Sequence, residues 1–315
     1  MKKLISHPVI IFIFKLIVSV SLILGLVFYI DFRSLLLSFE QANIPFLLLG
    51  FLLVGANTGI HFLRWKYVLR IVEPSISNAD AFNSLLIGFA AGFFTPGQIG
   101  EIAGRIAAHP TLRKSHIVGI TIIDKLYLLA LTLITGVSSI VLFVYLFMDA
   151  YWHPAYGIMT IILIPLILFL FLYPEFSKAI FTVIPEKFRR NKLFPVIEIF
   201  ETSFHNRHGR MLFLFSTLLY TVIFVQFYVF AKAFHSVDFF DSVICSSSVH
   251  FIKAVILPIS IGDLGVRESA SVFFFSKIGF PAAAAFNASI CMFFANLVIP
   301  SVSGSLLVLK LKIKQ

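Results

Sequence analysis

The apolar positions of this chain gather into long uninterrupted segments. A helix needs about 20 apolar residues to cross a hydrocarbon core of roughly 30 Å. Six segments meet that requirement: residues 8–30, 45–63, 117–147, 155–173, 211–235 and 281–309. Because the third and the sixth exceed the minimum, we expect them to tilt or to extend beyond the core. The pattern predicts an all-α, polytopic membrane bundle.

Two further stretches, residues 79–108 and 240–278, are apolar but are interrupted by glycine, proline and charge. Basic residues indicate how to place them, because cytoplasmic loops are rich in Lys and Arg. If both stretches crossed completely, the strongly basic loop 174–210 would lie outside, whereas it is cytoplasmic if neither crosses. We therefore predict six spans plus two re-entrant broken hairpins, with both termini cytoplasmic.

The two interrupted stretches contain the same motif. Residues 96–105 read PGQIGEIAGR and residues 258–267 read PISIGDLGVR, which share P-x-x-I-G-[DE]-[IL]-[AG]-x-R without a gap. Each copy follows two spans and precedes one, and an odd number of spans gives the two halves opposite orientations. This is the inverted-repeat arrangement of secondary transporters. We predict one membrane domain over residues 1–315, with repeat halves of about 1–150 and 151–315.

Composition supports a lipid environment and narrows the partners. The chain is 59% hydrophobic and 13% charged, whereas soluble domains average about 25% charged residues. The net charge is +10, and because the bases lie beside apolar segments, they favour anionic lipid headgroups over nucleic acid. Cys245 and Cys291 lie in apolar stretches without paired spacing, so we expect no metal site and no cofactor. A multi-pass protein of the cytoplasmic (plasma) membrane is predicted.

Ionisable residues at membrane depth are energetically costly and are therefore functional candidates. The candidate substrate-binding residues are Glu101, Arg105, Asp124, Lys125, Asp263, Arg267 and Glu268. In each motif the acid and the arginine four residues later share one helix face, so they can pair with each other or with the other copy. Asp124 and Lys125 belong to the third span and are candidate partners of the hairpin charges.

Proline and glycine interrupt the helix in both copies, which leaves backbone groups unpaired at depth. The expected hairpin breaks are at Pro96, Gly97, Gly100, Pro258, Gly262 and Gly265. A helix that begins after such a break directs free N–H groups toward it, where an anion is favoured. Arg105 and Arg267 would then contact phosphate through bidentate bonds. The alternative is that the ion pairs only lock the hairpins, and the residue types alone do not separate these two interpretations.

Other polar features receive simpler interpretations. Arg64-Trp65-Lys66 follows the second apolar segment, which is typical of an interfacial anchor. His205-x-x-His208 has metal-like spacing but no third ligand nearby, which favours a solvated face. The sequence contains no GxSxG, HExxH or Walker A motif, so enzyme chemistry is not expected.

Four features together resemble the lysylphosphatidylglycerol synthase transmembrane-region family. They are Arg64-Trp65, the hairpin from Pro96-Gly97 to Gly100-Glu101, the acid–base pair Asp124-Lys125, and Pro258 through Gly265-Val266-Arg267-Glu268. The resemblance covers essentially the whole chain. The last feature is the most specific, because the second hairpin of the family typically reads Gly-Gly-Leu-Gly-x-Arg-Glu.

The chain also departs from that family pattern. Asp263 stands where the family usually has Gly, and Gln98 stands where a basic residue is common. Asp124-Lys125 replaces a more usual Glu-Arg and keeps the charges. The resemblance implies lipid translocation by a membrane domain. Larger relatives add a soluble C-terminal domain that transfers amino acids to phosphatidylglycerol, and we expect no such activity here because the sequence ends at Gln315.

The predicted function is the translocation of an anionic lipid or lipid-linked headgroup between membrane leaflets. Two alternatives stay open: a membrane-embedded transferase that acts on a lipid carrier, and a small-solute secondary transporter with the same inverted repeat. The expected partners are membrane lipids and not nucleic acid. The sequence is compatible with a homo-oligomer and with a separately encoded lipid-modifying enzyme.

Overall fold

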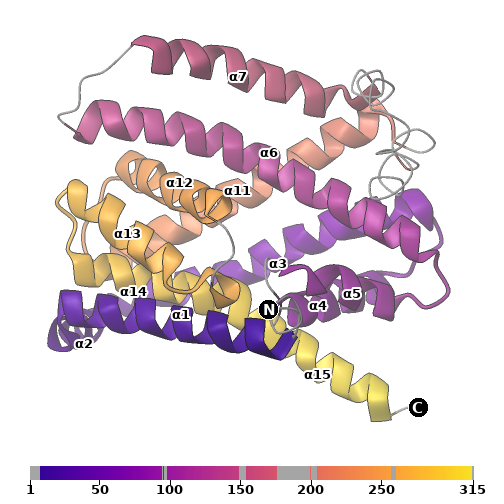
Figure 1. The fold of residues 1–315 in the computed structure, drawn as a ribbon, viewed down its shortest axis with the longest axis horizontal. Helices are drawn as coiled ribbons and strands as arrows, with labels where there is room; N and C mark the ends of the chain where they lie inside the picture. The colour runs from indigo at the N-terminus through magenta and orange to yellow at the C-terminus, as the bar shows by residue number, and fades with distance from the viewer. Residues whose placement is uncertain are drawn as a thin grey trace, which may run out of the picture.

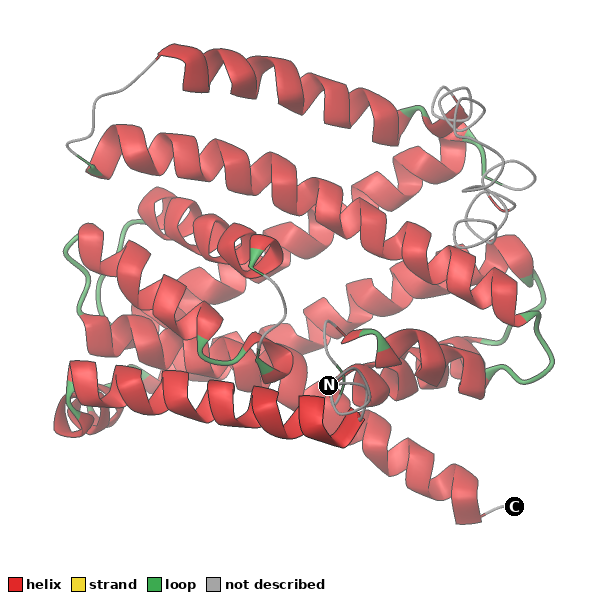
Figure 2. Cartoon of the chain, viewed as in Figure 1, coloured by secondary structure: helices red, strands yellow, loops and turns green. Residues whose placement is uncertain are grey.

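The computed structural model is a bundle of helices of very different lengths (Figure 1). It describes residues 8–93, 95, 98–148, 154–175, 199, 204–256 and 260–313. Along these residues Figure 2 shows helices and loops but no strand, which confirms the predicted all-α class.

Five helical segments within the described residues are long and apolar enough to cross a membrane. They are α1 (Pro8–Ile30), α3 (Ile44–Val72), α6 (Lys114–Phe147), α11 (Asn206–Phe234) and the run Ala282–Leu309. These five correspond to five of the six predicted spans. The sixth expected span forms α7 (Pro154–Leu172), whose described apolar stretch, Thr160–Leu172, is shorter than the other five.

The last long segment changes its winding in the middle. It consists of α14 (Ala282–Phe293), one π-helical turn (Phe294–Val298) and α15 (Ile299–Ile313). Pro300 explains the change, because it cannot donate a hydrogen bond to the carbonyl of the residue four positions earlier and its ring clashes with that carbonyl. The freed carbonyl belongs to Asn296, inside the π-helical turn. A local rewinding of this kind redirects neighbouring side chains and is frequent at functional sites.

Two pairs of short helices replace the two interrupted stretches. The first pair is α4 (Asn78–Phe93) with α5 (Gly100–Ala108). The second is α12 (Phe239–Val255) with α13 (Val266–Lys277), and a 3₁₀ turn at Ile261–Asp263 lies between them. Each of these helices has 17 residues or fewer, which is less than a span requires. Figure 1 shows the two pairs at opposite ends of the bundle, with their breaks toward its middle.

The packing of the two halves follows one scheme. α3 lies against α11, α4 against α15, and α12 against α6. The short helix that opens each pair thus contacts the last long segment of the other half. Outside this core, α2 (Phe32–Glu40) begins after Asp31, whose side chain accepts a hydrogen bond from the Ser34 amide at 3.3 Å.

Of the three buried hydrophobic clusters among the described residues, two are large. One gathers around α11, α13 and α14, where the rings of Phe227 and Phe275 stack with their centroids 5.4 Å apart. The other surrounds Trp65 and Leu69 of α3, both of which are fully buried. Large apolar side chains such as Leu24 and Phe28 of α1 are exposed, as expected for a surface that lipid covers.

A small residue permits the close crossing of α15 and α4, and replacing it should weaken that contact. A methyl group on Gly304 would meet the Leu86 carbonyl and lie 3.0 Å from Cβ of Ala90. We predict that Gly304→Ala lowers the free energy of unfolding by about 1–3 kcal/mol, because overpacking displaces backbone. Gly59→Ala on α3 is the matched control, since nothing lies within 4 Å of its added methyl group. Thermal unfolding in detergent compares the two variants, and equal midpoints would contradict the prediction.

Candidate functional site

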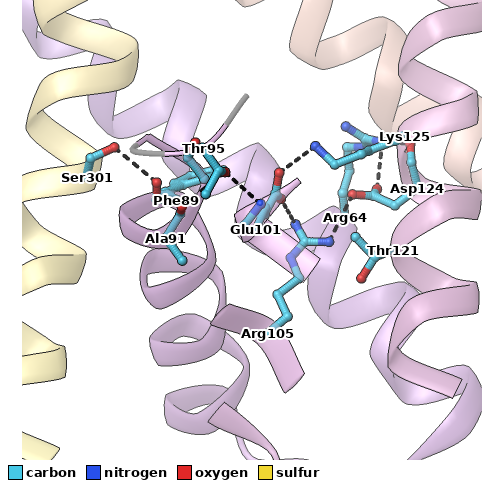
Figure 3. A network of polar contacts seen from close by, with 12 residues as sticks. Arg64, Phe89, Ala91, Thr95, Glu101, Arg105, Thr121, Asp124, Lys125 and Ser301 are labelled. Carbon is cyan, nitrogen blue, oxygen red and sulfur yellow. Dashed lines mark hydrogen bonds and ion pairs between the residues drawn. The ribbon is translucent and has the colours of Figure 1, made fainter. Parts of the chain in front are cut away.

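The first motif brings together charged side chains from three helices (Figure 3). Glu101 and Arg105, one turn apart on α5, form the predicted pair, with Oε1 and Nη2 2.5 Å apart. Lys125 of α6 places its Nζ 2.5 Å from Oε2 of the same glutamate. Asp124, also on α6, places Oδ2 3.6 Å from Nη1 of Arg105. The expected partnership of Asp124 and Lys125 with the charges of the first motif is therefore confirmed.

Arg64 of α3 completes this network, although the sequence interpretation placed it at an interface. Its Nη2 lies 2.7 Å from Oδ1 of Asp124 and donates to the Asp124 carbonyl at 2.9 Å. The residue is 1% exposed, so the interpretation as an interfacial anchor was wrong. The reason is that α3 continues for two more turns, through Val72. The signal for this was available, since Val68, Leu69, Ile71 and Val72 extend the apolar segment beyond Trp65.

Trp65 packs its ring against the arginine of the motif. The guanidinium carbon of Arg105 lies 3.8 Å from the centroid of the Trp65 ring, a cation–π contact. The indole Nε1 donates to Oγ of Ser84 at 2.7 Å, which fixes the ring against α4. Arg105 is thus held by two carboxylates and an aromatic face and is 1% exposed. Within the first motif, these contacts join α5 to α3 and α6.

The second motif pairs its charges differently from the expected pattern. Asp263 lies 3.5 Å, Oδ2 to Nζ, from Lys253 of α12 rather than beside Arg267. Arg267 pairs with its neighbour Glu268 at 2.8 Å and donates from Nε to Oγ of Ser289 at 3.3 Å. An i, i+4 pair requires both residues on one helix, and α13 begins only at Val266. The predicted pairing of Asp263 with Arg267 therefore does not form.

The breaks occur where glycine was expected to produce them. In the second motif Gly262 and Gly265 have φ of 56° and 91°, a left-handed conformation that glycine adopts without steric cost. The Gly265 amide donates to Oε2 of Glu268 at 2.7 Å, which caps the start of α13. In the first motif α5 begins at Gly100, whose amide donates to Oγ1 of Thr95 at 2.7 Å. Pro96, Gly97 and Pro258 lie outside the described residues.

Both motifs line one cavity of about 210 Å³. Gln98 and Glu101 reach it from the first break, and Lys253, Gly262 and Arg267 reach it from the second pair of helices. The remainder of its wall comes from α3, α4, α6, α11, α12 and the segment around the π-helical turn; it includes Asn57, His61, Phe89, Leu128, Tyr220, His250, Met292, Asn296 and Leu297. Arg105, Asp124, Lys125, Asp263 and Glu268 are not among the residues that line this cavity.

A second cavity, of about 240 Å³, adjoins the first and shares Gln98, Lys253 and Gly262 with it. Asp263, Thr95 and Ser260 complete its polar side. The shared residues make the two cavities one polar region between the breaks.

The wall of the first cavity carries groups that can bind a polar ligand. Lys253 and Arg267 supply positive charge and Glu101 supplies negative charge. Nδ2 of Asn57 and Oδ1 of Asn296 are buried and have no hydrogen-bond partner among the described residues. Buried polar atoms normally have partners, so these atoms are suited to bind a ligand or water. Clusters of three or more metal-binding side chains are absent from the described residues.

Comparison with known proteins places these features in a family context. The family model described as "Lysylphosphatidylglycerol synthase TM region" matches residues 13–304. A UPF0104 membrane protein of Methanocaldococcus jannaschii is 24% identical over 321 aligned positions, which cover 94% of each chain. The match to the family model includes both broken motifs and all residues of the two charge networks.

Proposed function

Because the chain belongs to the lysylphosphatidylglycerol synthase transmembrane-region family, we propose that it moves lipids with an anionic headgroup between membrane leaflets. The observation that carries this proposal is the cavity that both broken motifs line, with Lys253 and Arg267 on its wall. Ionisable side chains at membrane depth are energetically costly, and where they line a cavity they typically mark the path of a polar substrate. The headgroup would occupy this cavity while the hydrocarbon chains stay in an apolar environment.

The proposal includes an inverted repeat with two re-entrant hairpins. Three features support it: the helices of both pairs are too short to span, the pairs lie at opposite ends of the bundle (Figure 1), and α4 and α12 each pack on the last long segment of the other half. In this topology α7 is the sixth span and both termini are cytoplasmic, in the plasma membrane. Rocking of one half against the other would then expose the cavity to each side in turn.

The two arginines of the motifs have different roles in this proposal. Arg267 lines the cavity, and its guanidinium can offer a phosphate two parallel donors. Lys253 also lines the cavity and adds a second positive charge to its wall. Arg105 is already held by Glu101 and Asp124 away from the cavity. It therefore acts as a structural lock on the first hairpin.

Reconstitution tests this function directly. The purified chain would be incorporated into phosphatidylcholine liposomes that contain a trace of headgroup-labelled phosphatidylglycerol, and a membrane-impermeant quencher would report which leaflet the label occupies. We expect the protein to accelerate exchange of the labelled lipid between leaflets relative to empty liposomes. A rate equal to that of empty liposomes would contradict the proposal.

The same preparation separates the alternatives. Mass spectrometry of the extracted lipids would reveal a new covalent product if the protein were a transferase. Uptake of radiolabelled phosphate or amino acids without lipid exchange would indicate a small-solute carrier. We expect neither, because the chain contains none of the hydrolase, metalloprotease or nucleotide-binding motifs named above, and because an apolar groove of about 400 Å³ lies beside the second break, between α1 and the α12–α13 pair.

A further inference from the structure

An apolar groove of about 400 Å³ lies beside the second break, between α1 and the α12–α13 pair. Leu22 contributes from α1, Ile252 and Ile256 from the end of α12, and Val266 and Phe273 from α13. Among the described residues of this wall, Ser269 is the one with a polar side chain, and its hydroxyl donates to the Gly265 carbonyl at 2.6 Å. The hydroxyl is thereby satisfied within the helix, so the groove presents hydrocarbon to an occupant.

The groove adjoins the polar region between the breaks. Ile256 belongs to the wall of the groove and also to the wall of the polar cavity of about 240 Å³. That cavity in turn shares Lys253 with the deeper one, where Arg267 lies. An elongated amphiphile that extended from one compartment into the other would pass Ile256.

Adjacent residues on α12 and α13 divide the two compartments. On α12, Ile252 faces the groove whereas Lys253 faces the polar cavities. On α13, Val266 faces the groove whereas Arg267 faces the deeper cavity. Neighbouring helical residues point to different sides, so each helix carries an apolar face and a basic face at the same level. A phosphate and the hydrocarbon attached to it would meet these two faces together.

We propose that this groove holds one hydrocarbon chain of the lipid whose headgroup occupies the polar cavity. The inference rests on the proposed lipid translocation and adds a binding site for the tail. A chain gains little free energy by leaving bilayer lipid for an apolar wall, since lipid tails are about as apolar as leucine. The groove therefore orients the substrate and guides its tail, while the charged residues supply the affinity.

Photocrosslinking tests the site. The full chain in phosphatidylcholine liposomes would be exposed to phosphatidylglycerol with a diazirine at the middle of one acyl chain, and crosslinked peptides would be mapped by mass spectrometry. We expect crosslinks on residues 252–274. Unlabelled phosphatidylglycerol should suppress them although the phosphatidylcholine of the liposome, present in large excess, does not, and Arg267→Gln should reduce them to background. Crosslinks that neither unlabelled phosphatidylglycerol nor Arg267→Gln alters would mean that bulk lipid fills the groove. That result would overturn the tail site and leave the proposed function standing.

A groove-filling variant gives an independent measurement. Ser269→Phe should slow the exchange of long-chain phosphatidylglycerol but leave that of a dibutyryl analogue unchanged, because only the long chain needs the groove. Val302→Phe, on an exposed face of α15 (54% exposed), is the matched control and should affect neither lipid. Equal effects of Ser269→Phe on both lipids, or no effect on either, would contradict the tail site while the proposed function stands. If the wild-type protein exchanges neither lipid, both the tail site and the proposed function are overturned.

Discussion

Asp124→Asn is expected to lower the free energy of unfolding by about 3–5 kcal/mol, the usual cost of removing one partner from a buried ion pair. Asp124 holds Arg64 at 2.7 Å and Arg105 at 3.6 Å, and both arginines are 1% exposed. The network contains three bases and two acids, so the variant leaves three bases facing one carboxylate. An amide oxygen can still accept a hydrogen bond, but it does not neutralise a guanidinium. Chemical or thermal unfolding in detergent measures the loss.

Two further variants show whether the loss arises from unpaired charge. Glu40→Gln removes an exposed carboxylate at the end of α2 and should change stability by less than about 0.5 kcal/mol. Arg64→Gln combined with Asp124→Asn removes the 2.7 Å pair as a whole and should recover part of the stability. In that double variant Arg105 keeps its ion pair with Glu101. If the double variant instead has a lower free energy of unfolding than Asp124→Asn, uncompensated charge is not the cause of the lost stability.

The sequence was sufficient to predict the breaks and the charges near them. Proline and glycine at membrane depth have few structural uses, so a repeated Pro-x-x-Ile-Gly-acid pattern predicts two interrupted helices. The helix ends at Phe93 and Val255 and the restarts at Gly100 and Val266 agree with that prediction. The pairing of Glu101 with Arg105 followed because both residues lie on one regular helix.

The sequence misled where backbone geometry decides the partners. The two copies match without a gap, and Gly100 of the first aligns with Gly262 of the second. However, α5 begins at Gly100, whereas α13 begins four residues after Gly262. Asp263 has a φ of 61° and lies before the helix, so it reaches Lys253 instead of Arg267. Glu268, which has no counterpart in the ten-residue motif, becomes the partner of Arg267. Such a shift depends on how the break packs, which the residue pattern does not record.

Long-range contacts were the other gap. Arg64 and Asp124 are 60 positions apart, and the charges alone offered several partners for each. The pair depends on how α3 packs against α6, which the sequence pattern does not specify. The shared cavity has the same origin, since it needs the breaks of both halves and the wall of α11 at once.

Arg267→Gln is expected to slow lipid exchange about ten- to a hundredfold, because a hydrogen bond to a charged group contributes roughly 1.5–3 kcal/mol. Arg267→Lys should give an intermediate rate, since ammonium keeps the charge but loses the planar fork that suits phosphate. The exchange assay with headgroup-labelled phosphatidylglycerol measures both variants. Arg105→Lys is the matched comparison at the aligned position of the first motif. It should act mainly on stability, because Arg105 does not line the cavity.

Arg267 also neutralises Glu268, at 2.8 Å, so slow exchange alone would not separate phosphate binding from locking. Arg267→Gln combined with Glu268→Gln separates them, because it removes both charges and leaves amides that can still bond to each other, to Ser289 and to the Gly265 amide. If Arg267 only locks the hairpin, the double variant should regain exchange as it regains stability. If Arg267 binds the headgroup, stability returns and exchange stays slow, because the cavity wall has lost the group that contacts phosphate. We expect the second result, since Arg267 lines the cavity whereas Glu268 does not.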